Sequence, residues 1–204
     1  MNNESKKIEV GESNLKAAFE VADESTKKVL EALFGKIKIE PPDDKKPSLK
    51  DYKSIRSYAD ACEALGEKVD EEKLSEAGVP KHIIAQMKLE LICKALWGGG
   101  VKVYSDPDGN RIYWYPWFDL FNQSEIDRLS DEEKGCLLSA NADDGAIAGF
   151  GCLDAIYRSS GSIAHSGIRL YLDTEEKAEY FGKQFLELWA EAIAFNFSVG
   201  ERLK

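Results

Sequence analysis

The sequence predicts an α+β protein, with a helical N-terminal half followed by a small antiparallel β-sheet on which a long C-terminal helix packs. Apolar residues recur at helical spacing through most of residues 15–97. Between residues 101 and 172 the pattern changes to short strand-like runs separated by turn residues. Residues 173–195 return to helical spacing with one apolar stripe, which suits a helix lying on a sheet.

The beginning of the chain is expected to form a separate segment. Helical spacing in 15–22 and 29–34 and the proline-rich stretch "KIEPPDDKKPS" at 38–48 predict an N-terminal helical segment and linker over 1–47. The main α+β domain would then span 48–204. A single domain over the whole chain is the alternative, because 204 residues suit either arrangement.

Three helices are expected next. Ser48 would cap a helix over 52–65 that Gly66 ends, and "DEEKLSEAG" at 70–78 indicates a short second helix. The third runs from Pro80, which suits a first helical turn, to the glycines at 98–100.

The predicted sheet begins after these glycines. "VKVY" at 101–104 and "RIYWYPWF" at 111–118 flank turn residues and predict a β-hairpin. Residues 124–144 are expected to form an exposed acidic helical insertion that contributes little to stability. "GFGCLDAIYRSS" at 149–160 and "GIRLYLD" at 167–173 predict further strands around a Gly/Ser-rich loop at 158–167.

The C-terminal helix is the strongest helical pattern. Asp173 and Glu176 fit a capping box at its start, and Phe185 and Trp189 lie on its apolar face. Gly182 in its middle lowers helix stability, so we expect close packing against the sheet there.

Charge and hydropathy exclude several classes of function. The net charge is −10, and residues 101–150 hold four basic against ten acidic residues, so direct binding to a nucleic-acid backbone is not expected. No apolar run is long enough for a membrane span. The N-terminus lacks a secretory signal, which predicts a protein that stays in the cytoplasm of the cell that makes it.

No residue pattern predicts catalysis, a metal or a cofactor. The cysteines Cys62, Cys93, Cys136 and Cys152 form no CxxC pair, so we expect them to be reduced and mostly buried. Phosphate-loop and nucleophile-elbow motifs are absent from the sequence. An enzyme would have to use an unrecognised arrangement, such as a Cys152–His165 dyad or the Asp143–Asp144 pair, and turns or packing explain both pairs more simply.

The stretch "RIYWYPWFDLF" at 111–121 contains six aromatic residues in eleven positions. Strand alternation puts Ile112, Trp114, Pro116 and Phe118 on one face, which we assign to the core. The other face would carry the candidate binding residues Arg111, Tyr113, Tyr115 and Trp117. Either the N-terminal helices cover this second face, or it is an exposed platform for a partner or ligand.

Two motifs resemble a family of uncharacterised proteins encoded by phages and prophages of gut anaerobes. They are "RIYWYPWF" and the closing "GIRLYLDTEEKAEYFGKQFLELW", and the second match includes Tyr180, Gly182, Lys183, Phe185 and Trp189. The family has no assigned activity, so the resemblance implies a phage or prophage gene product and no catalytic residue. It also implies a location in the cytoplasm of a bacterial host cell or in association with a virion.

The sequence therefore favours a non-enzymatic, phage- or prophage-associated interaction protein that binds an unknown protein or surface ligand. One alternative is a recognition module for a carbohydrate or cell-surface receptor, with the aromatic strand stacking on the ligand. Another is an acidic inhibitor that mimics nucleic acid and occupies a nucleic-acid-binding protein. An enzyme of unrecognised type is the fourth possibility.

Overall fold

A computed structural model describes residues 26, 28–30, 46–104, 106–143, 145–161 and 168–204. The chain divides into two units, Met1–Asp44 and Lys45–Lys204. In the first unit only residues 26 and 28–30 are described, and they are helical. The other predicted features of that unit, including the helix at 15–22 and most of the linker at 38–48, lie outside the described residues.

In the second unit, helices come before and after the first three strands along the chain. A 3-10 helix, η1 (Tyr52–Ser54), precedes α3 (Tyr58–Leu65), α4 (Glu71–Glu76) and α5 (Lys81–Leu96). The middle of the unit holds β1 (Ile112–Phe121), α6 (Gln123–Ile126), α7 (Asp131–Lys134), β2 (Leu137–Asn141) and β3 (Gly149–Ser159). It closes with η3 (Ile168–Leu170), α8 (Glu175–Gln184), α9 (Leu186–Ile193) and β4 (Ser198–Arg202).

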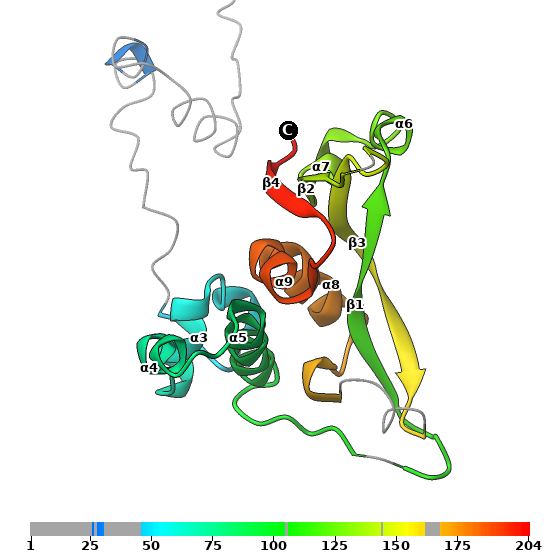
Figure 1. Ribbon diagram of the computed structural model, residues 1–204. Helices are drawn as coiled ribbons and strands as arrows, with labels where there is room; N and C mark the ends of the chain where they lie inside the picture. The colour runs from blue at the N-terminus through cyan, green and yellow to red at the C-terminus, as the bar shows by residue number, and fades with distance from the viewer. Residues whose placement is uncertain (1–25, 27, 31–45, 105, 144, 162–167) are drawn as a thin grey trace, which may run out of the picture. The chain divides into compact units, whose positions relative to one another are not determined.

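The four strands form one antiparallel sheet in the order β1-β3-β2-β4. Helices α8 and α9 lie on one face of this sheet, and α5 packs on the other side of α9, with α3 beside it (Figure 1). The predicted α+β fold is thus confirmed. None of the helices in the described ranges combines the length and the apolar character that a membrane crossing needs.

The helices before the sheet follow the sequence pattern closely. The short helix α4 and the long helix α5 are confirmed, and Gly66 ends α3 with a positive φ of 68°. The predicted cap at Ser48 is wrong. Helix α3 begins later, where the Ser57 side chain accepts a hydrogen bond from the Asp60 N–H at 3.1 Å. Residues 52–54 form the separate turn η1 instead.

The predicted C-terminal helix is two helices that meet at Phe185, whose φ and ψ of −109° and 29° are not helical. Side chains satisfy two carbonyls near the break. The Trp189 indole N–H donates to the Phe181 carbonyl at 3.2 Å, and the Arg202 guanidinium donates to the Lys183 carbonyl at 2.9 Å. The N-cap is Thr174, one residue later than predicted, and its hydroxyl accepts from the Lys177 N–H.

Two predicted strands are wrong. Residues 101–104 form no strand, so the predicted hairpin between 101–104 and 111–118 is absent. Strand β1 pairs with β3 along the length of β1 instead. The predicted strand at 167–173 contains η3 and a single antiparallel bridge between Trp114 and Leu172. Both stretches have apolar residues suited to strands, but each lies near the start of β1 and packs there as irregular chain.

The acidic stretch 124–144 is not an exposed insertion. It contains two single-turn helices and then β2, the strand between β3 and β4. Leu137 and Leu138 of β2 are completely or almost completely buried, and Ile126 of α6 is 5% exposed. β4 was not predicted at all, because Ser198–Arg202 is a short and mostly exposed edge strand.

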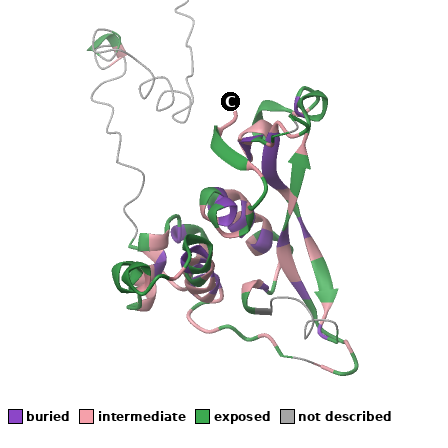
Figure 2. Ribbon diagram, in the orientation of Figure 1, coloured by how far each residue is buried: buried purple, intermediate pink, exposed green. Residues whose placement is uncertain are grey.

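The core lies where α5, α8 and α9 face one another and the sheet (Figure 2). Phe185 and Trp189 are both buried, as predicted. A Cβ atom at Gly182 would collide with the Cys152 sulfur and would lie 2.7 Å from the Pro116 Cβ. This confirms the close approach between the C-terminal helix and the sheet that the glycine predicted.

Candidate binding surface

Strand β1 presents three of the four predicted core residues to the helices. Pro116 is buried beneath Gly182, and Phe118 stacks on Phe150 with ring centroids 5.4 Å apart. Trp114 packs against the main core, to which α5, α8 and α9 contribute. The fourth residue, Ile112 at the beginning of the strand, is 52% exposed.

The opposite face of β1 is its outer face, and its predicted binding residue Tyr113 is buried. Only 5% of Tyr113 is exposed, since Trp97 and Val103 from the segment after α5 pack over its ring. Its hydroxyl accepts a hydrogen bond from the Tyr104 N–H at 3.1 Å and lies 3.5 Å from the Lys102 carbonyl. Tyr113 is therefore part of a small aromatic core and cannot stack on a ligand.

Tyr115 is half-buried on the same face. Its ring lies against Tyr171, with ring centroids 4.8 Å apart, and Tyr171 is itself buried. The Arg158 guanidinium of β3 lies 5.8 Å from the centre of the Tyr115 ring, a cation–π arrangement. These contacts hold the Tyr115 ring in place while part of it stays open to solvent.

Trp117 is the most exposed aromatic residue on the outer face of β1, with 41% of its surface accessible. Its ring meets the Tyr115 ring nearly edge to face, with centroids 6.4 Å apart. Its indole N–H donates to the Asp119 carboxylate at 3.1 Å. Asp154, which is the β3 partner of Trp117, is exposed beside it.

Arg111 lies at the other end of the strand and does not join these residues. Its guanidinium is 5.1 Å from the centre of the Tyr104 ring, and its backbone pairs with Ser160. The buried Tyr113 separates it from Tyr115 along the strand. Of the four predicted residues, the structure brings only Tyr115 and Trp117 together on an open surface.

We define the aromatic–arginine surface as Tyr115, Trp117, Asp119, Asp154 and Arg158. The three charged residues were not among the sequence candidates. Asp154 and Arg158 belong to β3. Their place beside Tyr115 and Trp117 follows from the register of β1 against β3, which became known only from the structure. The alternation of exposed charges in "LDAIYR" at 153–158 was the available signal, but it did not say which strand these side chains would adjoin.

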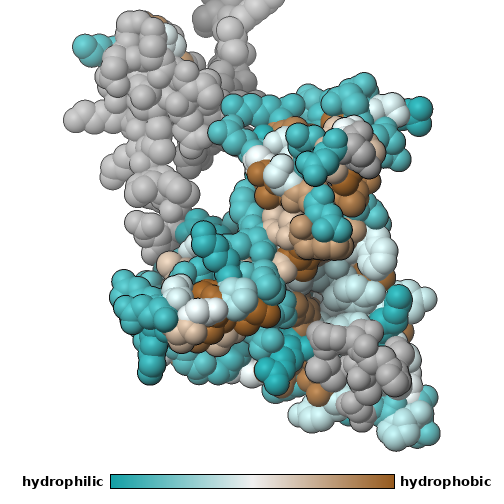
Figure 3. Space-filling model, in the orientation of Figure 1, coloured by the Kyte–Doolittle hydropathy of each residue, from teal (hydrophilic) through white to brown (hydrophobic). Residues whose placement is uncertain are grey.

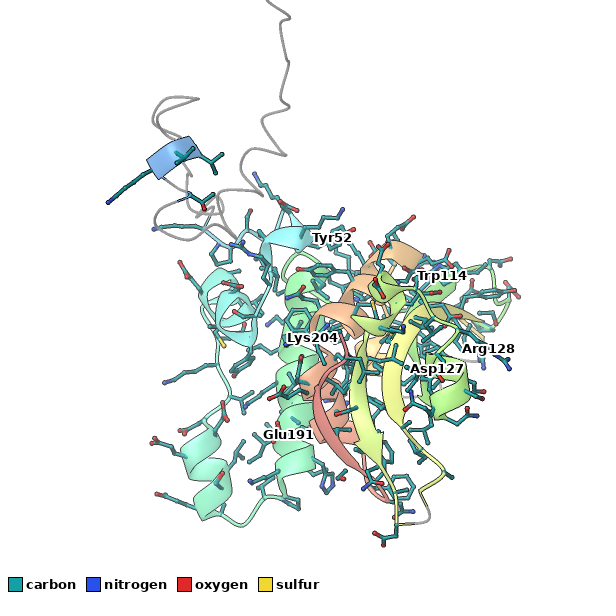
Figure 4. The ribbon with its side chains drawn as sticks, turned by 90° about the horizontal axis from the view of Figure 1, so that it is seen from above. Tyr52, Trp114, Asp127, Arg128, Glu191 and Lys204 are labelled. Atoms are coloured by element: carbon teal, nitrogen blue, oxygen red, sulfur yellow. The ribbon has the colours of Figure 1, made fainter. Side chains whose placement is uncertain are left out.

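The two ends of the outer face are covered, although not by the N-terminal helices of the sequence hypothesis. The segment after α5 covers the beginning of β1, as described for Tyr113. At the other end, Ile126 of α6 packs over Gly149 and Leu137. Figure 4 agrees, since Asp127 and Arg128 after α6 lie on the opposite side of the sheet from Glu191 of α9.

Other surfaces offer less chemistry. One cavity of about 560 Å³ lies beside η1, α8 and β4. Two of the cations that line it are ion-paired, Lys183 with Glu179 and Arg202 with Glu187, both at 2.7 Å. Apolar side chains also reach the surface over α5 and near the end of α9, where Phe195 is 83% exposed (Figure 3).

No catalytic arrangement is evident in the described part of the chain. Within the described ranges, no three His, Cys, Asp or Glu side chains are grouped closely enough to hold a metal ion. His82 is exposed, and His165, most of the Gly/Ser-rich loop and Asp144 lie outside the described residues. The hypothetical dyad of Cys152 with His165 and the Asp143–Asp144 pair therefore gain no geometric support.

All four cysteines are free thiols. Cys93 and Cys152 are buried, and Cys62 and Cys136 are half-buried. Burial raises the pKa of Cys152 to about 12, against the opposing effect of the Lys183 charge. Burial also raises the pKa of Cys93, whose sulfur lies 3.5 Å from the Tyr171 carbonyl. Both groups are therefore protonated at neutral pH.

Comparison of the chain with protein-family models, with curated proteins and with solved structures found no match.

Proposed function

We propose that this protein is a non-enzymatic interaction protein of a phage or prophage, and that it binds a protein partner through the aromatic–arginine surface. The observation that carries the proposal is Trp117, a large aromatic residue that is 41% exposed on a paired strand. The few residues that dominate the binding energy of protein interfaces are enriched in Trp, Tyr and Arg. Here one of each lies within a single group of contacts.

The contacts that hold Tyr115 and Trp117 in place also favour binding. Tyr115 and Trp117 project from the middle of a strand that is paired on one side with β3 and packed from below by α8. Buried Tyr171 fixes the Tyr115 ring, and the Asp119 carboxylate fixes the Trp117 indole. A partner would therefore order few additional side chains on this protein, which lowers the entropic cost of association.

The geometry favours a protein over a carbohydrate. The Tyr115 and Trp117 rings cross at 63°, so they do not form one flat surface along which successive sugar rings could stack. A protein side chain can enter the angle between the two rings, with Arg158 and Asp154 available for polar contacts at the edge.

The nucleic-acid-mimic hypothesis receives less support. Glu125 and Glu133 bend back to accept hydrogen bonds from the backbone N–H groups of Asn122 and Ser130, which completes a capping box at α6 and at α7. Two acids of the acidic stretch therefore stabilise helix ends, where they do not form a phosphate-like row. The resemblance of the closing motif to phage-encoded proteins favours a phage or host protein as the partner.

A site-specific crosslinking experiment tests the proposal. A photo-crosslinking amino acid at position 117 should capture a partner from host or phage-infected lysate, because this position would lie inside the interface. The same reagent at position 157 is the matched control, since Tyr157 is 56% exposed on the helix-side face of the same two strands. Equal capture at both positions, or capture at 157 alone, would contradict the proposal.

Affinity measurements with the captured partner complete the test. Trp117→Ala and Arg158→Ala should each weaken binding at least tenfold, as hot-spot residues do. Tyr157→Ala should leave the affinity unchanged within about twofold. If Trp117→Ala binds as the wild type does, the partner uses another surface.

A further inference from the structure

Two cysteines lie opposite each other at neighbouring strands of the sheet, Cys152 within β3 and Cys136 in the turn directly before β2. Leu137 of β2 pairs with Gly151 of β3, and Leu138 pairs with Phe150. In an antiparallel ladder the next pair outward is Cys136 with Cys152. The ladder continues to this position, since the Cys152 N–H donates to the Cys136 carbonyl at 3.4 Å.

This placement puts the Cα atoms of the two cysteines at a separation that a disulfide can span. Directly opposed residues in antiparallel strands have Cα atoms about 4.5 to 5.5 Å apart. Disulfides join residues whose Cα atoms are about 4.4 to 6.8 Å apart. Residues opposite each other also project from the same face, which here is the face that carries α8, since the Cys152 sulfur lies against Gly182.

The thiols currently point to different carbonyls, the Cys136 sulfur to Glu132 at 3.6 Å and the Cys152 sulfur to Asp154 at 3.3 Å. A disulfide would require each side chain to rotate about its Cα–Cβ bond into another staggered rotamer, so that the two sulfurs face each other. The two residues are near neighbours, because the hydrogen bond from the Cys152 N–H to the Cys136 carbonyl joins their backbones.

The two cysteines differ in access. Cys136 is half-buried in the turn directly before β2 and can meet a small oxidant, whereas Cys152 is buried. Two cations adjoin the pair. Arg202 donates to the Gly135 carbonyl at 3.1 Å and to the Lys183 carbonyl at 2.9 Å, and Lys183 follows directly on Gly182.

We propose that Cys136 and Cys152 form a redox-sensitive pair that a peroxide converts to an intrachain disulfide. The Cys136 thiolate attacks one peroxide oxygen, the O–O bond breaks, and the released hydroxide takes a proton to become water. Cys136 is then a sulfenic acid. The Cys152 sulfur attacks the Cys136 sulfur, the S–O bond breaks, and the leaving hydroxide combines with the Cys152 proton. Two thiols and one hydrogen peroxide thus give one disulfide and two waters.

The other two cysteines are not partners for this pair. Cys62 lies on α3 and Cys93 on α5, two helices that pack against each other away from β2. The Cys93 sulfur contacts the Tyr171 carbonyl in the core. The proposed disulfide does not depend on the proposed binding function, because the aromatic–arginine surface is on the opposite face of the sheet.

Peptide mapping of the intact wild-type protein tests the proposal. After treatment with hydrogen peroxide, digestion without reductant should yield a crosslinked peptide containing Cys136 and Cys152, with the mass of two hydrogens lost. A thiol reductant should reverse the change. A crosslink through Cys62 or Cys93, or over-oxidation of Cys136 without any crosslink, would overturn it.

Variants sharpen the assignment of roles. In Cys152→Ser the sulfenic acid at Cys136 has no resolving thiol, so a dimedone-type probe should label it more strongly than in the wild type. Cys62→Ser is the matched control, since Cys62 is also half-buried, and its crosslink should form as in the wild type. Stronger labelling of Cys152 than of Cys136 in the wild type would reverse the assigned order and contradict the proposal. If Cys152→Ser does not fold, the wild-type peptide map still decides.

Discussion

The two faces of the β1–β3 pair are built in different ways. On one face Trp114, Pro116 and Phe118 lie under two regular helices, with Gly182 allowing α8 to approach closely. On the other face irregular chain covers Tyr113 at one end and α6 covers Gly149 at the other, and only the middle is open. Strand alternation thus tells which side chains share a face, and it does not tell how much of that face is covered.

The largest effect is expected on the helix side. Trp189→Ala should lower the free energy of unfolding by about 3–5 kcal/mol, because it removes a buried ring and leaves a cavity. The ring contacts Phe118 and Phe181, and its indole N–H satisfies the Phe181 carbonyl at the break between α8 and α9. Chemical denaturation measures this loss. Glu191→Ala, an exposed change on the same helix, should stay within about 0.5 kcal/mol; a loss below about 1 kcal/mol for Trp189→Ala would mean that α9 is not docked.

The second-largest effect on stability is expected at the end of the outer face that α6 covers. Leu137→Ala should cost about 2–5 kcal/mol, because Leu137 is fully buried beneath α6. Leu120→Ala is the control, since Leu120 is 48% exposed. The midpoints of thermal unfolding of the two variants decide the question. Equal stability of Leu137→Ala and wild type would restore the idea that residues 124–144 are a dispensable insertion.

A smaller effect is expected at the other covered end. Tyr113→Phe keeps the buried ring but removes the hydroxyl that contacts Tyr104 and Lys102, so it should cost about 1 kcal/mol. Tyr104→Phe removes an exposed hydroxyl and should change stability by less than about 0.5 kcal/mol. Urea titration of both variants provides the comparison, and identical midpoints would show that the hydroxyl of Tyr113 is solvated.

The open middle should show the smallest effect on stability. Trp117→Ala should cost less than about 1 kcal/mol, because the ring is 41% exposed and contacts mainly Tyr115. Its effect should appear in partner binding instead. A destabilisation as large as that of Trp189→Ala would show that Trp117 is a core residue, and the difference between the two faces would disappear.

Elements with a long and regular pattern were predictable. Helix α5 and strand β3 agree with their sequence predictions, because each has enough periodic apolar residues to specify one conformation. The stretch 137–141 was not recognised as a strand, since its acidic, helix-favouring neighbours conceal five residues that pair on both sides. Tertiary pairing decides such short segments.

The candidate surface divides in the same way. Tyr115 and Trp117 could be named from alternation within β1. Arg158 and Asp154 could not, because they adjoin β1 only through the pairing of Tyr113 with Arg158 and of Trp117 with Asp154. The burial of Tyr113 was equally unpredictable, since it depends on where the chain after α5 runs.

The amino-acid sequence by itself determined the α+β class, the positions of the main helices, the close contact at Gly182 and the two-sided pattern of β1, because local periodicity and backbone sterics specify these features. The tertiary structure alone decided the strand order β1-β3-β2-β4, the break at Phe185, the covered and open parts of the outer face, and the opposition of Cys136 and Cys152. Each of these depends on contacts between residues far apart in the chain, whose free energy no local pattern records.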